Sequence, residues 1–114
     1  MPIDTNDVLK KMMDSAESAF GTGWNSVKQY APAEFKKMAL QIAEIAENVA
    51  LYKADPNKGY SEETGKLLLK MQRNACEGVL VAVTQLTMIA VQKALDAILK
   101  ILKDTFPGPI AAIL

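Results

Sequence analysis

Residues 61–105 read SEETGKLLLKMQRNACEGVLVAVTQLTMIAVQKALDAILKILKDT, and this stretch decides the fold. It contains no proline, and Gly65 and Gly78 are its only glycines. Its polar residues recur at steps of three or four residues, or at two such steps, which places them on one narrow stripe of an α-helix. That stripe consists of Lys66, Lys70, Arg73, Glu77, Thr84, Gln92, Asp96, Lys100 and Lys103.

Both ends of this stretch carry the signals of a single helix. Ser61 is a suitable N-cap, acidic residues follow it, and lysines stand in the last turn, where they oppose the helix dipole. The alternative is a break near Gly78, which would give four comparable helices. One glycine costs a helix only about 1 kcal/mol, so we expect one long C-terminal helix over about residues 61–105.

The residues before this stretch also have a helical period. Asp4 or Thr5 can cap a first helix that ends at residues 21–23, and residues 24–30 allow another short helical segment. Pro32 suits the first turn of a helix that continues to the turn at residues 55–60.

No part of the chain alternates apolar and polar residues as a strand does, so residues 1–114 predict a single all-α domain. The predicted architecture is a helical bundle built on the long C-terminal helix. Two or three shorter helices pack on that helix, and the 55–60 turn forms an antiparallel hairpin.

The charge balance argues against nucleic acid as a partner. Lys and Arg together number 13, as do Asp and Glu, so the formal net charge is zero. A neutral chain with interspersed charges has no long-range attraction for a phosphate backbone. We therefore expect a protein that does not bind nucleic acid.

The residues that usually carry catalysis or bind metals are missing from the sequence. There is no histidine, which removes the commonest general base and metal ligand. Cys76 is the single cysteine, so an internal disulfide is impossible and a buried, unreactive thiol is expected. The start of the sequence does not resemble a signal peptide. We expect a cytoplasmic, non-enzymatic protein with no catalytic, cofactor-binding or metal-binding residues.

Excess apolar surface predicts self-association. A continuous helix over 61–105 would be about 66 Å long, and the two preceding helices could cover it only on one side. We expect a homo-oligomer, with a dimer favoured, and a self-association face formed by Val79, Ala82, Leu86 and Ile89. Leu86 and Ile89 should be buried against residues of the second helix, or against a partner helix. The expected contacts on the second helix are Met38, Ile42 and Ile45.

The sequence ends in an unusually apolar tail. Pro107 and Pro109 redirect the chain, and residues 110–114 read IAAIL. We expect this tail to dock on the bundle or on a neighbouring subunit through Ile110, Ile113 and Leu114. The alternative is a flexible tail that a partner recognises through its terminal residue.

Two functions fit these observations. The first is a structural or interaction protein that acts through assembly, with a further protein partner possible. The second is a membrane-active helical protein that inserts residues 79–91 into a bilayer. Residues 78–92 are uncharged but too short to span a hydrocarbon core of about 30 Å, so the first function is favoured.

Overall fold

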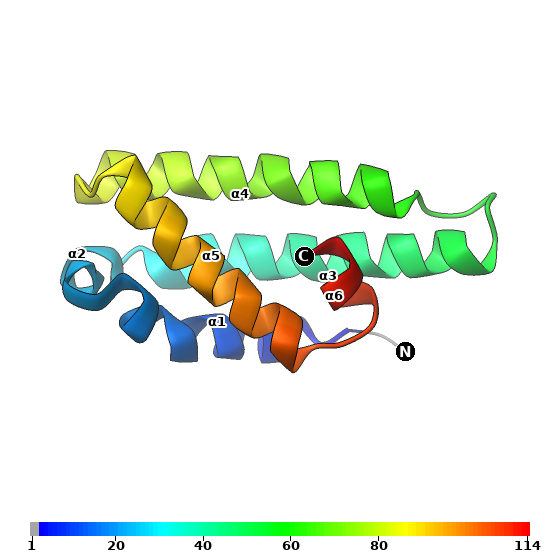
Figure 1. Cartoon of the computed structure of the whole chain (residues 1–114), viewed down its shortest axis with the longest axis horizontal. Helices are drawn as coiled ribbons and strands as arrows, with labels where there is room; N and C mark the ends of the chain where they lie inside the picture. The colour runs from blue at the N-terminus through cyan, green and yellow to red at the C-terminus, as the bar shows by residue number, and fades with distance from the viewer. Residues whose placement is uncertain (1–2) are drawn as a thin grey trace.

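The computed structural model describes residues 3–114, and its regular secondary structure over this range is helical throughout (Figure 1). The prediction of an all-α bundle is confirmed. In chain order the elements are α1 (Thr5–Phe20), a 3₁₀ turn (Gly21–Gly23), α2 (Trp24–Val27), α3 (Ala31–Ala54), α4 (Glu62–Thr84), α5 (Met88–Thr105) and α6 (Pro109–Ile113).

The helix ends before the long apolar stretch follow the local sequence signals. The Asp4 carboxylate accepts a hydrogen bond from the backbone N–H of Asn6 at 2.9 Å, which caps α1. Gly21 ends that helix with a φ of +57°. Pro32 lies in the first turn of α3, where its missing N–H has no cost. These boundaries agree with the predicted ones.

The predicted antiparallel hairpin is formed by α3 and α4, which run side by side in opposite directions (Figure 1). Gly59 has a φ of +60°, and a Cβ atom there would lie 2.0 Å from the carbonyl oxygen of Asn48. Only glycine can occupy that position. The next residue, Tyr60, donates its backbone N–H to the same carbonyl at 3.3 Å. Ser61 then caps α4 by accepting from the N–H of Thr64.

The predicted single helix over residues 61–105 is wrong, because the chain breaks at residues 85–87. Gln85 adopts the left-handed conformation with a φ of +62°. Thr84 Oγ1 accepts from the backbone N–H of Leu86 at 3.2 Å, and Thr87 Oγ1 accepts from that of Ala90 at 3.1 Å. These hydroxyls satisfy the backbone groups that a break exposes. The alternative placed the break near Gly78, which is wrong because Gly78 lies inside α4, but its four comparable helices do occur as α1, α3, α4 and α5.

After the break, α5 turns back and packs mainly on α1, with further contacts to α4 and α6. In Figure 1 it runs diagonally in front of α3 toward α1. Its inward side, which includes Val91, Leu95, Ile98 and Leu102, is fully buried with residues of α1 and α3. The chain therefore covers most of its own core, which the predicted long helix could not do. The predicted helix over residues 61–105 therefore gives no support for self-association. Only apolar surface that stays exposed in the folded chain can support it.

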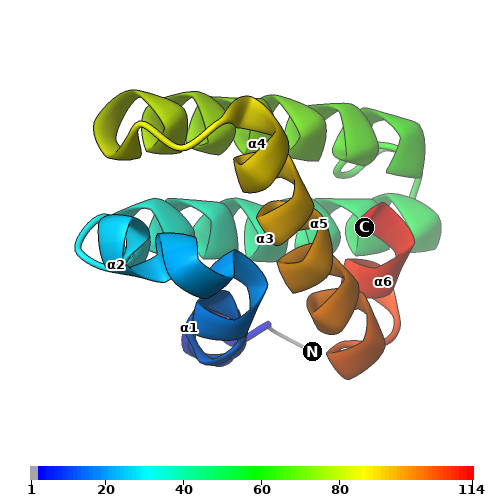
Figure 2. The same cartoon turned by 60° about the vertical axis from the view of Figure 1, so that its left-hand side comes forward.

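The apolar C-terminal segment forms α6, which packs on α3, α4 and α5. Ile110 is 3% exposed and Ile113 is 2% exposed, while Leu114 is partly buried. In Figures 1 and 2 this helix lies against α3, close to the lower end of α5. The tail residues thus contribute to the core of the same chain.

Candidate functional site

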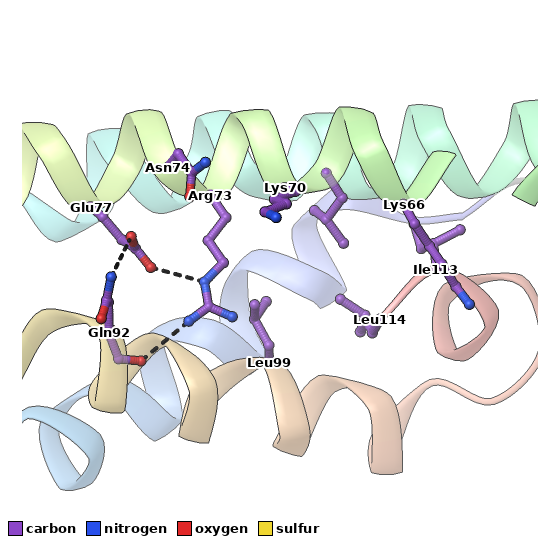
Figure 3. Close-up of a pocket in the computed structure, with 10 residues that line it drawn as sticks. Lys66, Lys70, Arg73, Asn74, Glu77, Gln92, Leu99, Ile113 and Leu114 are labelled. Atoms are coloured by element: carbon purple, nitrogen blue, oxygen red, sulfur yellow. Dashed lines mark hydrogen bonds and ion pairs between the residues drawn. The ribbon is translucent and has the colours of Figure 1, made fainter. Parts of the chain in front are cut away.

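A groove lies where α4 faces α5 and α6, and it has a volume of about 500 Å³ (Figure 3). An adjoining hollow shares Arg73, Leu99 and Leu114 with it. Because the chain reverses at residues 85–87, the polar stripe of the sequence folds back on itself and lines both sides. The groove and hollow together include Lys66, Lys70, Arg73, Glu77, Gln92, Asp96, Lys100 and Lys103.

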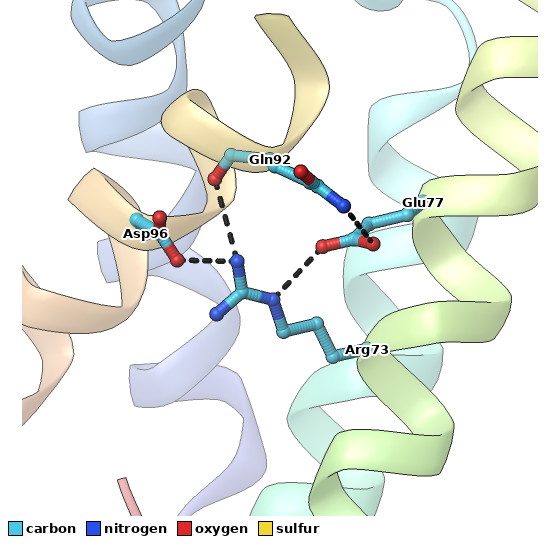
Figure 4. Close-up of polar contacts among 4 residues, drawn as sticks. All are labelled: Arg73, Glu77, Gln92 and Asp96. Atoms are coloured by element: carbon cyan, nitrogen blue, oxygen red, sulfur yellow. Dashed lines mark hydrogen bonds and ion pairs between the residues drawn. The ribbon is translucent and has the colours of Figure 1, made fainter. Parts of the chain in front are cut away.

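Arg73 links the two sides of the groove (Figure 4). Its Nε donates to Glu77 Oε1 on α4 at 2.9 Å, and its Nη2 donates to the carboxylate of Asp96 on α5. Nη2 also lies 3.4 Å from the carbonyl oxygen of Gln92, whose side-chain amide donates to Glu77 Oε2 at 3.5 Å. Burial opposes the charge on Arg73, but both carboxylates favour it and raise its pKa overall. This polar network holds α5 against α4.

Cys76 is 1% exposed and lies beside two acidic side chains. Burial, followed by the charges of Glu34 and Glu77, raises the pKa of the thiol to about 12. The reactive thiolate is therefore scarce at neutral pH. Residues 3–114 also contain no group of three or more Cys, Asp or Glu residues that could hold a metal ion.

The outer side of α4 is the second feature that stands out from the rest of the surface. Every exposed residue between 71 and 84 is uncharged, and the two charged residues in that interval, Arg73 and Glu77, turn toward α5. The exposed residues of this interval, together with Leu67 and Leu68 of the preceding turn, recur at a spacing of three or four residues. They therefore form one continuous side of the helix. We call this side the outer face of α4; its apolar residues are Leu67, Leu68, Met71, Ala75, Gly78, Val79, Ala82 and Val83, and the uncharged polar residues Gln72 and Asn74 lie among and beside them.

The other three long helices differ from α4 in this respect. The exposed residues of α1 include Asp7 and Lys10, those of α3 include Lys36 and Glu44, and those of α5 include several of each charge. A helix side that faces water normally carries such charges. In both Figure 1 and Figure 2, α4 lies along one edge of the bundle, with no helix on its far side. The outer face of α4 is mainly apolar although no helix between residues 3 and 114 covers it.

The structure separates the four residues of the predicted self-association face. Val79 and Ala82 lie on the outer face of α4, and Val79 is 38% exposed. Leu86 belongs to the turn and is partly buried; a Cβ atom on Gly23 would come within 3.2 Å of its Cδ1. Ile89 lies in the first turn of α5 and is 65% exposed, so its predicted burial within the chain is wrong. The break rotates these two residues away from the α4 surface.

Sequence reasoning missed three large residues of the outer face, namely Leu67, Leu68 and Met71. The sequence contained a signal for them, because no charged residue lies on this side of the helix between Leu67 and Val83.

Comparison with protein-family models, curated proteins and solved structures finds no match for this chain. None of the helices in residues 3–114 combines the length and the apolar character needed to cross a membrane.

Proposed function

We propose that this protein is a non-enzymatic assembly module that forms a homodimer through the outer face of α4. The observation that carries the proposal is an exposed side of one helix that is free of charge and mainly apolar over about four turns. Contiguous apolar patches of this kind mark interaction sites on proteins.

The size of the patch is adequate for a specific but modest interface. Leu67 is 63% exposed and Met71 is 67% exposed, and Leu68, Val79 and Val83 are each more than a third exposed. Together the five side chains offer on the order of 500 Å² per copy, so two copies would bury about 1,000 Å². That is the lower limit for a specific interface, which supports a dimer with a dissociation constant in the micromolar range.

A second copy of the chain fits this surface better than a charged partner. In a twofold symmetric contact each residue near the axis meets its own counterpart, so a charged residue there would face a like charge. The outer face of α4 has no such residue. The formal net charge of zero also means that two copies do not repel each other at long range.

Small residues along the middle of the face support close packing of two α4 helices. Ala75, Gly78 and Ala82 lie at helical spacing, and a Cβ atom on Gly78 would meet no other atom within 4 Å. Two helix backbones can approach closely where such residues face each other, and the larger flanking side chains then pack around them.

The membrane-active alternative receives less support. The 79–91 segment that it requires is interrupted at residues 85–87, so it is not one apolar helix. A cytoplasmic location remains part of the proposal, because a single buried thiol does not depend on an oxidising compartment.

Sedimentation equilibrium tests the proposal. Protein concentrations of roughly 1–200 µM cover the range in which an interface of this size associates. We expect a dimer for the wild-type chain and a monomer near 12.4 kDa for Ala75→Glu, which places two like charges in the contact. Ala97→Glu on the exposed side of α5 is the matched control and should remain dimeric. A wild-type monomer throughout, or equal dimerisation of both variants, would refute the proposal. Vesicle binding that only Ala75→Glu abolishes, without a dimer, would assign the face to membranes instead.

A further inference from the structure

The groove between α4, α5 and α6 has a composition that the proposed dimer does not explain. Its wall is apolar at the end where α6 packs, and its rim is basic (Figure 3). We infer that it binds an anionic amphiphile with a single unbranched alkyl chain, of the fatty-acid class. This inference is independent of the proposed dimer, because Ala75 and the other apolar residues of the outer face of α4 do not line the groove.

The apolar part of the groove comes from three helices. Leu69 of α4, Leu99 of α5 and Ile113 of α6 line it together with Leu114. Leu69 and Ile113 are almost fully buried and form a fixed wall, whereas Leu99 and Leu114 remain partly accessible. A volume of about 500 Å³ lies within the range of small-molecule sites, and the apolar wall beside a polar, basic rim is suited to a ligand that has an alkyl chain and a charged head.

The charge at the rim selects an anionic head group. Five cationic side chains line the groove and the adjoining hollow, which are Lys66, Lys70, Arg73, Lys100 and Lys103. The two carboxylates that line them, Glu77 and Asp96, are both already bound to Arg73.

Three of the lysines remain available to a ligand. Lys66 pairs with Glu62 at 3.2 Å, but within residues 3–114 neither Lys70 nor Lys100 nor Lys103 forms an ion pair. Even with a carboxylate on Leu114 counted, positive charge exceeds negative charge around the groove. An uncharged or cationic amphiphile would leave these ammonium groups without a partner.

Isothermal titration calorimetry with dodecanoate, below its micelle concentration and at neutral pH, tests the inference. We expect a dissociation constant of about 10–100 µM. Across octanoate, decanoate and dodecanoate the affinity should rise by up to about fourfold per methylene group until the groove is full. Butanoate, which has the head without the tail, and decyl maltoside, which has a tail without charge, should bind at least tenfold more weakly.

Variants locate the site. Lys70→Glu should weaken dodecanoate binding about tenfold, and Leu99→Trp, which fills the groove, should abolish it. Lys36→Glu on the exposed side of α3 is the matched control and should bind as the wild type does. Circular dichroism checks that each variant is folded. Ala75→Glu should also bind normally, so failure of the dimer leaves this test intact.

Methyl NMR spectra give a second readout that does not depend on folding of the variants. Dodecanoate should shift the methyl resonances of Leu69, Leu99 and Ile113 in the wild-type chain. Equal affinity for butanoate and dodecanoate, no dependence on chain length, or shifts spread over the whole protein would overturn the inference. Binding only to anionic phosphatidylglycerol vesicles, with no binding of free dodecanoate, would overturn it as well.

Discussion

Arg73 on α4 and Asp96 on α5 form an ion pair although 23 residues separate them in the sequence. In one continuous helix they would lie about 35 Å apart. Their contact, together with the bond from Arg73 to Glu77, shows how the reversal at residues 85–87 converts a polar stripe into the polar seam between two helices.

The two partners of Arg73 should differ in their importance for stability. Glu77 is 5% exposed, so Arg73→Met leaves a buried carboxylate without its ion pair and should destabilise the fold by about 2–4 kcal/mol. The side chain of Asp96 is 62% exposed, so Asp96→Asn should cost less than about 1 kcal/mol. Urea denaturation followed by circular dichroism measures both. Equal costs would show that the seam is not organised around Glu77.

Two residues of α5 test the direction in which this helix faces. Leu95 is fully buried, and Leu95→Ala should cost about 2–5 kcal/mol. Ile89 is 65% exposed, and Ile89→Ala should change the free energy of unfolding by less than about 0.5 kcal/mol in dilute protein. The same denaturation experiment compares them. A large cost at Ile89 and a small one at Leu95 would contradict the observed rotation of α5.

The two glycines of α4 form a matched pair. A Cβ atom on Gly65 would lie 2.7 Å from Val49 Cγ2 and 3.0 Å from Ile45 Cγ2, so Gly65→Ala should destabilise the fold by about 1–3 kcal/mol. Gly78 has open space beside it, and Gly78→Ala should stabilise by about 1 kcal/mol through helix propensity. The melting temperature should therefore fall for Gly65→Ala and rise for Gly78→Ala. Stabilisation by both changes would mean that α3 and α4 are not in close contact at Gly65.

Cys76 should make stability depend on alkaline pH. Its pKa is raised in the folded state, so above about pH 9 the unfolded thiol loses its proton while the folded thiol keeps it. The contribution of the Cys76 thiol to the free energy of unfolding is complete below the pKa of the unfolded state, and it is lost as the pH rises toward about 12. Urea denaturation at pH 8 and pH 10.5 measures how much the free energy of unfolding falls between the two pH values. This fall should be smaller for Cys76→Ala than for the wild type. At pH 8 a thiol reagent should label the wild type at least about 100-fold faster in urea than in buffer.

Removal of residues 110–114 tests the role of the tail. Ile110 and Ile113 are buried in the core, so the truncated protein should melt at a lower temperature by several degrees. Differential scanning calorimetry measures this change, and Ala111→Ser is a mild control because Ala111 is only partly buried. An unaltered melting temperature would show that α6 contributes nothing to the fold.

Local signals predict most of the helices. Asp4, Gly21 and Ser61 act through contacts with residues next to them, and such contacts can be inferred from the sequence. The break at Gln85 could not be inferred in the same way, because Thr84, Gln85 and Thr87 are all compatible with a helix. The polar stripe stayed in phase across the break, so a single helix and two facing helices gave the same pattern.

The candidate surfaces were predicted only in part for a related reason. Val79 and Ala82 lie on the outer face of α4, where they are open to the self-association predicted for them, but the sequence could not show which part of this helix α3 covers. The packing of α4 decides this division, since Leu69 and Leu80 are buried in the core whereas Met71 is 67% exposed. The groove needed the reversal itself, since Lys70 and Leu99 belong to different helices.

The contact between α1 and α5 has a consequence for biosynthesis. The helix made first packs extensively against one made more than 80 residues later, so the interior of the protein closes only when residues 88–105 are present. A growing chain that ends at Thr84 contains the residues of α1, α3 and α4 but lacks the side chains of α5 that cover them, so we expect it to aggregate and to bind chaperones more readily than the full chain.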